Sequence, residues 1–366
     1  MNMKKIALGM LGVAFTAVLV WAETNDLKIT EQPQDQTAAE GSRVTFSVKA
    51  EGKSGISMDM IWIKPGNFVM GSPTNEIGRW EDERQWPCNV NMGFWLGKYE
   101  VTQAQYKAVI DANPSRGYGE GDNYPVYNVS WSDATNFCAK LTAQEKAAGR
   151  LPKGYAYSLP MEVLWEYACR AGTTTAFNNG MDIASEDQCW EKPCPNLEPV
   201  AWYPRNSGGA CHPVGQKEPN AWGLYDMHGN VWEWCLDWYP GFDDKLRLVR
   251  GGAWCHFARY CRSAARGSGA PNNRDHGSGF RVSLIPTSSD SFSSLSEEAK
   301  KDFKVPLGEL TYQWKHDGAT IKGATDPSYT IEQVKPKDAG NYYVVVRCNG
   351  RSVVSDRVRL TLADKE

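Results

Sequence analysis

Histidine is scarce in this chain, with five residues among 366. The sequence contains no HExxH motif or other spaced histidine pair, which disfavours a zinc hydrolase. It also lacks a GxSxG elbow and a glycine-rich phosphate loop, so nothing supports a serine hydrolase or a P-loop nucleotide site. The net charge of -3 shows no basic excess, and there is therefore no electrostatic case for nucleic-acid binding.

Long hydrophobic runs are absent beyond the first 22 residues. Lys4 and Lys5 precede an apolar run that ends at Val20, and Val20 and Ala22 place small residues at the two positions that define signal cleavage. We therefore predict a signal peptide at residues 1–22 and an exported chain, periplasmic or extracellular, with no stable membrane span after cleavage. The alternative is a single membrane anchor, for which the run is short. In an oxidising compartment the ten cysteines could pair.

Aromatic residues are abundant, with 15 Trp and 16 Tyr beside 34 Gly and 20 Pro. This composition is typical of a loop-rich globule rather than of a helical bundle. Helical spacing of apolar residues occurs in two short stretches, 133–141, which follows Ser132 as a candidate N-cap, and 162–170. We expect both helices to pack on a sheet.

The two ends of the chain have the patterns of strands from one β-sandwich. In residues 29–50 a polar edge strand precedes Val44, Phe46 and Val48, whose alternation is typical of a strand with one buried face. The next strand of such a sandwich should carry a central tryptophan, and none follows there. The expected strand occurs much later, in LTYQWKHDG, which contains Trp314.

The segment DAGNYYVVV, which begins at Asp338, resembles the corner motif of immunoglobulin-like domains. In that motif the tyrosine, here Tyr342, bonds back to the chain. The usual inter-sheet cysteines would fall at Val48 and Val344, so apolar contact replaces the disulfide. We therefore expect Val48 and Val344 to pack together.

These resemblances imply one immunoglobulin-like domain that is interrupted between its second and third strands. We assign it residues 27–52 and 308–363, and we treat the Ser-rich, charged residues 286–307 as the returning linker. Insertion of a domain at an exposed loop is physically cheap. The alternative is two unrelated β segments on either side of a domain at residues 56–285.

Residues 56–285 contain recognisable segments in collinear order, among them MIWIKPGNFVMGS, YSLPMEVLWEYACRAGT, HPVGQKEPNAWGLYDMHGNVWEWCLDWY, RGGAWCHFARYCRSAARG and GFRV. Together they resemble the formylglycine-generating enzyme family, also called sulfatase-modifying factors. The resemblance implies a C-type-lectin-like fold with much irregular structure. We therefore expect an α+β domain of this kind inserted into an all-β immunoglobulin-like sandwich.

The loop DMHGNVWEW places Glu233 between aromatic residues, and a buried carboxylate needs a partner. In the resembled family this segment supplies a structural Ca²⁺ site, and hard oxygen ligands on irregular backbone suit that ion. Carried over by position, the ligands are the Glu233 side chain and the carbonyl groups of His228, Gly229 and Val231. The alternative is that Glu233 only accepts backbone hydrogen bonds. A second Ca²⁺ site of the family is sought around residues 201–206.

Active members of the family oxidise a substrate cysteine to formylglycine with O₂. They bind Cu(I) through two cysteines, a choice that the softness of thiolate ligands explains. By position these cysteines are Cys255 and Cys261, and Trp234 and Arg266 would line the groove. The resemblance thus implies an exported oxidase whose peptide or protein substrate is a sulfatase.

The chain departs from the active pattern in three ways. Five residues separate Cys255 from Cys261 where active members have four, the stretch to the following Ala-Ala-Arg is shorter, and Ala253 replaces an active-site serine. The alternatives are a structural disulfide or free thiols at this pair, and a non-catalytic, lectin-like scaffold that binds a protein or a glycan. Cys189 and Cys194 are a better disulfide candidate, because their loop is polar and contains proline.

Overall fold

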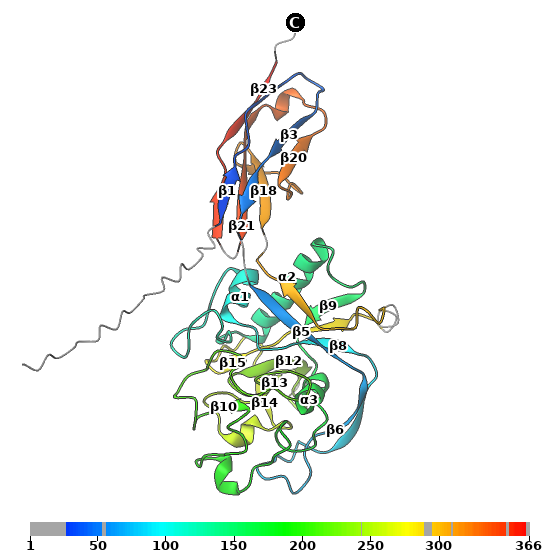
Figure 1. Ribbon diagram of the computed structural model, residues 1–366, viewed down its shortest axis with the longest axis vertical. Coiled ribbons are helices and arrows are strands. Elements are labelled where there is room, and N and C mark those ends of the chain that lie inside the picture. Colours follow the sequence, from blue (N-terminus) through cyan, green and yellow to red (C-terminus); the bar gives the residue numbers. More distant parts are fainter. Residues whose placement is uncertain are drawn as a thin grey trace, which may run out of the picture.

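The computed structural model describes residues 27–52, 56–242, 244–288, 295–308, 310–348 and 351–363. Figure 1 shows a small body made mainly of strands, which contains the C-terminal strands, and a larger mixed body below it. The signal peptide expected at residues 1–22 lies outside the described residues. Within the described ranges, no helix has the length and apolar character needed to cross a membrane.

The small body is built from both ends of the chain. Its larger sheet follows the order β19 (Ala319–Thr320), β18 (Thr311–His316), β21 (Gly340–Cys348), β23 (Val358–Leu362) and β2 (Gln36–Ala38), and β22 (Arg351–Val354) also pairs with β21. Two more pairs join β1 (Lys28–Glu31) to β4 (Lys49–Glu51), and β20 (Ser328–Ile331) to β3 (Val44–Ser47). Because β2 pairs with β23 and β3 with β20, strands from before residue 52 hydrogen-bond with strands from after residue 308.

One hydrophobic core joins these two parts of the chain. Val48 and Val344 both belong to it and are almost fully buried. The rings of Phe46 and Trp314 lie 6.2 Å apart in the same core. Tyr342 Oη donates a hydrogen bond to the carbonyl of Asp338 at 2.7 Å, and this confirms the predicted corner contact.

The larger body has two main sheets. One follows the order β17 (Phe303–Pro306), β5 (Ser57–Ile63), β8 (Phe94–Gly97), β16 (Ser283–Pro286) and β9 (Tyr155–Ser158). The other follows the order β14 (Arg266–Gly269), β13 (Arg247–Arg250), β12 (Trp232–Trp238) and β15 (Ser278–Gly279). Two short pairs complete it, β6 (Gly66–Met70) with β7 (Trp86–Val90) and β10 (Ala201–Trp202) with β11 (His228–Gly229).

Helices are few in the described residues. They are α1 (Gln103–Ile110), α2 (Trp131–Ala147) and α3 (Glu162–Arg170), with 3-10 turns η1 (Glu186–Cys189), η2 (Ala258–Cys261) and η3 (Pro336–Asp338). The sequence placed α3 correctly, but α2 is longer than expected and its N-cap is Ser130 rather than Ser132. Ser130 is the N-cap because it forms a capping box with Asp133. In this box each side chain accepts a hydrogen bond from the other residue's backbone N–H.

The expected linker is partly a strand. β17 pairs antiparallel with β5 from Phe303 opposite Met60 to Pro306 opposite Ser57. Val305 and Leu307 are buried in the main core of the larger body. Residues 303–307 therefore belong to the larger body, because their alternating apolar side chains complete its sheet edge. Ser57 and Pro306, the ends of these two strands, are paired opposite each other.

Candidate functional site

Two glycines shape the loop that carries both cysteines of interest. Gly251 and Gly252 follow β13 with φ angles of 96° and 78°, a conformation that strains other residues. A Cβ atom on Gly252 would lie 2.6 Å from Cys261 Sγ. The glycines therefore let the chain turn tightly against Cys261 before η2 returns it to β14.

Cys255 and His256 form a close pair at the start of this loop. Cys255 is half-buried and its Sγ lies 3.3 Å from His256 Nδ1. The Trp232 indole N–H also lies 3.3 Å from this nitrogen and can only donate, so Nδ1 is the acceptor and Nε2 carries the proton. Burial lowers the pKa of His256, and burial together with the charge of Asp275 raises the pKa of Cys255 to about 11. At neutral pH the pair is a neutral imidazole beside a protonated thiol.

Cys261 points into a different cluster. It is completely buried with Cys189 and Cys194 in a core formed by apolar side chains. Burial raises the pKa of its thiol. His228, also buried, donates from Nδ1 to the Cys261 carbonyl at 2.6 Å and fixes the backbone there. A copper site with two thiolates would require Cys261 to turn out of this cluster, so the observed donor set does not fit an open Cu(I) site.

All ten cysteines lie within the described residues, and all are free thiols. Neither candidate disulfide, Cys255–Cys261 or Cys189–Cys194, is formed. Cys189 and Cys194 occur in a segment with polar neighbours, yet both side chains are fully buried. The thiols therefore behave as small apolar groups in this core.

Trp234 and Arg266 do not line a groove with the cysteines. Trp234 is a core residue, and its indole N–H donates to the Val129 carbonyl at 2.9 Å. Arg266 forms a two-bond ion pair with Glu162, with both nitrogen–oxygen distances at 2.7 Å. It lines a separate cleft.

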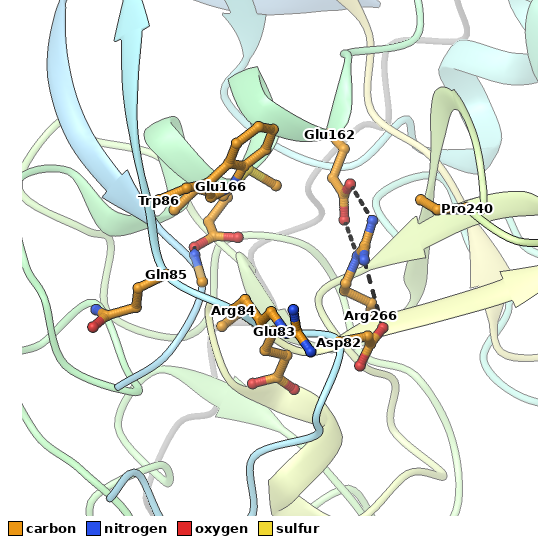
Figure 2. Close-up of a pocket in the computed structure, with 12 residues that line it drawn as sticks. Asp82, Glu83, Arg84, Gln85, Trp86, Glu162, Glu166, Pro240 and Arg266 are labelled. Carbon is orange, nitrogen blue, oxygen red and sulfur yellow. Dashed lines mark hydrogen bonds and ion pairs between the residues drawn. The ribbon is translucent and has the colours of Figure 1, made fainter. Parts of the chain in front are cut away.

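That cleft has a volume of about 440 Å³ and its lining includes neither Cys255 nor Cys261. Figure 2 shows Glu162 and Arg266 on one side and Gln85 and Trp86 on the other. Asp82 also faces Arg266, at 3.5 Å. The charges on this wall are therefore largely paired with one another.

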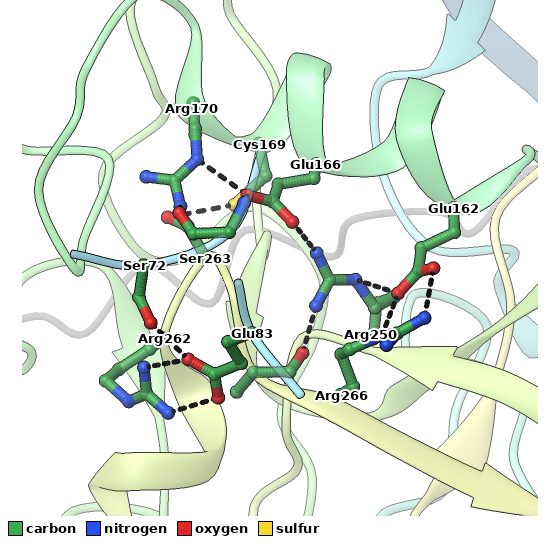
Figure 3. Close-up of polar contacts among 12 residues, drawn as sticks. Ser72, Glu83, Glu162, Glu166, Cys169, Arg170, Arg250, Arg262, Ser263 and Arg266 are labelled. Carbon is green, nitrogen blue, oxygen red and sulfur yellow. Dashed lines mark hydrogen bonds and ion pairs between the residues drawn. The ribbon is translucent and has the colours of Figure 1, made fainter. Parts of the chain in front are cut away.

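Buried ion pairs lie behind the cleft. They connect the loop at residues 71–85 with the end of η2, and α3 with β13. Arg262 binds Glu76 and Glu83 from this loop at 2.6 and 2.7 Å. Figure 3 shows the neighbouring network, in which Glu166 of α3 receives hydrogen bonds from Arg170 and Arg250. These charges are fully buried and paired, which is the arrangement that a protein interior requires.

Glu233, expected as a calcium ligand, is held by an arginine. Arg281 Nε and Nη2 each lie 2.6 Å from a Glu233 oxygen, and the Trp165 indole N–H donates to the same carboxylate at 2.6 Å. Side-chain donors therefore hold the Glu233 carboxylate, and its role as a calcium ligand stays a prediction. In the described part of the chain, no group of three or more His, Cys, Asp or Glu side chains is arranged to hold a metal ion.

Two further buried carboxylates lie in the same region, and the sequence analysis missed them. Glu100 accepts hydrogen bonds from the side chain of Asn230 and the backbone of Val231 at 2.7 and 3.0 Å. Asp226 Oδ1 is buried with no hydrogen-bond partner. Burial raises the pKa of Asp226 to about 6, and burial and the charges of Asp226 and Glu233 raise the pKa of Glu100. Asp226 stands in the quoted segment DMHGNVWEW, whereas no local pattern marks Glu100.

An aromatic surface beside the cysteine loop includes two exposed tryptophans, Trp80 and Trp190. Trp80 and Trp190 flank the Arg259 guanidinium, whose carbon lies 3.7 and 4.4 Å from their ring centres. The ring of Tyr260 lies 6.2 Å from that of Trp80 and 5.7 Å from that of His256. We call these five residues, Trp80, Trp190, His256, Arg259 and Tyr260, the aromatic face.

Comparison with known proteins gives consistent matches to one family. The Sulfatase-modifying factor enzyme 1-like domain matches residues 46–284. A formylglycine-generating enzyme of Streptomyces coelicolor is 32% identical over 68% of this chain and 76% of its own length. The chaperone protein LppX of Paenibacillus barcinonensis is 28% identical over 63% of this chain and 91% of its own length.

A solved structure shows the same fold. PvdO from Pseudomonas aeruginosa superimposes with a TM-score of 0.52 at 27% identity, over 62% of this chain and 93% of that protein. The order of the quoted segments, the mixed fold with few helices, and these matches agree. The chain therefore belongs to the formylglycine-generating enzyme, or sulfatase-modifying factor, family.

Proposed function

We propose that this protein is an exported binding member of its family, which holds a protein or a glycan at the aromatic face and does not generate formylglycine. The observation that carries the proposal is the complete burial of the Cys261 thiol, which belongs to a core with Cys189 and Cys194, while Cys255 is only half-buried. A thiol enclosed in this way is not exposed as one ligand of an open two-thiolate site would be. The name of one relative, a chaperone protein, is consistent with a binding role.

Export follows from the signal peptide proposed at residues 1–22. The small body, which we propose is an immunoglobulin-like domain, supports a role in presenting the larger body to a partner. Its corner tyrosine, its parallel β2–β23 edge and its central buried Trp314 are the features that support this assignment.

Formylglycine generation is the second candidate, and the Cys255–His256 contact favours it. The half-buried thiol beside an imidazole is the one part of the expected catalytic pair that remains accessible. Such an oxidase would act on a sulfatase cysteine, with Cys255 and Cys261 as the copper ligands. It would require a rearrangement of η2 that brings Cys261 to the surface.

Copper binding separates the two candidates. We expect the reduced mature chain to show no stoichiometric, tight Cu(I) binding, and a double variant Cys255→Ser, Cys261→Ser to match it in a competition titration. We also expect no aldehyde by mass spectrometry after incubation of the copper-treated protein with a sulfatase-derived cysteine peptide. One tightly bound Cu(I) per chain that the double variant loses, or aldehyde formation, would replace the binding proposal with the oxidase.

We further propose a Ca²⁺ site beside Asp226 and Glu100. Three buried carboxylates, Glu100, Asp226 and Glu233, lie within electrostatic reach of one another and of Arg281, and Lys217 also acts on Asp226. The unpartnered Asp226 Oδ1 fits a hard cation. The carbonyl groups of residues 228, 229 and 231, expected as ligands from the family resemblance, would be further oxygen ligands. When bound, the ion would supply charge compensation and hold the loop before β12.

Calcium should therefore stabilise the protein. After removal of metal with EDTA, we expect Ca²⁺ at about 100 times its Kd to add roughly 2.7 kcal/mol to the free energy of unfolding, seen as a higher Tm. Asp226→Asn should lose most of this gain, whereas Asp187→Asn, at an exposed ion pair, should keep it. Equal melting temperatures with and without Ca²⁺ for the parent chain would exclude the site.

A further inference from the structure

The Arg259 side chain joins three segments of the aromatic face. Trp80 comes from the loop between β6 and β7, Trp190 directly follows η1, and Arg259 lies in η2. Its guanidinium carbon is 3.7 Å from the centre of the Trp80 ring and 4.4 Å from that of Trp190. Cation–π contacts at these distances orient the guanidinium plane between two indoles.

The charge of Arg259 has no partner in the described part of the chain. No hydrogen bond from its nitrogens and no carboxylate within 4.0 Å of them occurs there, and its Nε is buried without an acceptor. Arg262, three residues further on, is in contrast fully paired with Glu76 and Glu83. Glu186, from the adjacent η1, lies against the Cys189 thiol at 3.8 Å.

The two indoles remain open to solvent while they flank this cation. Trp80 and Trp190 are 38% and 41% exposed. Tryptophan, tyrosine and arginine are the residues most enriched at the energetic centres of protein–protein interfaces. A guanidinium that stacking already holds in place loses little conformational freedom when it binds a carboxylate. It can bind the carboxylate through two parallel hydrogen bonds.

We propose that Arg259 and its two flanking tryptophans form a binding site for an acidic side chain of a partner protein, with an apolar or aromatic neighbour that stacks on the indoles. This inference rests on the proposed binding function and names the partner's chemistry. The carboxylate supplies the missing counter-charge, and the exposed indole surfaces supply the apolar contact. The composition of the face favours a protein segment over a glycan.

Defined peptides test the proposal. The probes are two fluorescently labelled, N-acetylated and C-amidated dodecapeptides, three repeats of Gly-Ser-Glu-Phe and three repeats of Gly-Ser-Gln-Phe, titrated against the full mature chain by anisotropy. We expect the glutamate peptide to bind at least tenfold more tightly. Arg259→Gln should remove that difference, and Arg259→Lys should restore it only in part. The matched control is Arg359→Gln, which removes one exposed charge from the small body.

Each outcome decides a different point. Equal binding of both peptides that Trp80→Ala and Trp190→Ala abolish would overturn the role of Arg259 and leave the aromatic face as the binding surface. Binding of heparin but of neither peptide, lost in Arg259→Gln, would overturn the protein partner in favour of an acidic glycan. Binding that neither tryptophan substitution changes would overturn both this inference and the proposed use of the face.

Discussion

Arg281→Met should lower the free energy of unfolding by about 3–5 kcal/mol, the range for removal of one partner from a buried ion pair. The guanidinium is fully buried, binds Glu233 through two nitrogens at 2.6 Å, and donates to the Gly97 and Tyr225 carbonyls at 3.0 and 2.9 Å. Without it, Glu233 would retain only the Trp165 N–H. The measurement is urea unfolding in EDTA, so that no metal ion replaces the lost charge.

The matched control for this experiment is Arg274→Met. Arg274 makes an equally close pair with Asp133, at 2.7 Å, but its side chain is more than half exposed. Exposed pairs of this kind contribute little to stability, because solvent screens the two charges. A loss for Arg281→Met no larger than that of Arg274→Met would show that Arg281 is not the main counter-charge for the buried carboxylates.

Much of the local structure could be predicted because it depends on nearby residues. The helix at 162–170 follows from apolar spacing alone, and the Tyr342 bond to Asp338 joins residues four positions apart. The cap of α2 was also local, yet it was assigned to the wrong serine. Ser130 stands three residues before Asp133, the spacing of a capping box, and that signal outweighs proximity to the apolar residues.

The site could not be predicted to the same degree, because its partners are distant in sequence. Glu233 was correctly identified as a buried carboxylate, but Arg281, 48 residues away, holds it. Nothing in the local sequence distinguishes an arginine that neutralises a carboxylate from a metal ion that does so. β17 was missed for a related reason, since its pairing with β5 joins residues on either side of the whole larger body.

The directions of the Cys255 and Cys261 side chains could not be predicted either, although the two residues are close in sequence. Residue type and spacing placed Cys255 and Cys261 in one loop, but the direction of each side chain depends on η2 and on the Gly252 turn. Cys255 lies against His256, whereas Cys261 turns inward to Cys189 and Cys194.

Trp314→Ala should also cost about 3–5 kcal/mol, the range for truncation of a large buried aromatic side chain. Trp314 is fully buried in the core of the small body, pairs with Val344 across β18 and β21, and donates its indole N–H to the Asp326 carbonyl at 3.0 Å. Differential scanning calorimetry should show a lower Tm for the small-body transition. Trp190→Ala, at an exposed tryptophan, should leave that transition unchanged.

A milder pair of substitutions tests whether the two ends of the chain form one unit. Phe46 and Trp314 belong to opposite ends, and their rings lie 6.2 Å apart. Phe46→Leu and Trp314→Phe should therefore be non-additive by about 0.5–1.5 kcal/mol in a double-mutant cycle. Phe46→Leu combined with Phe137→Leu, in the core of the larger body, should be additive to within about 0.5 kcal/mol. Strict additivity of the Phe46 and Trp314 changes would mean that residues 27–52 and 308–363 fold as separate β segments, because a shared core requires the energy of each ring to depend on the other.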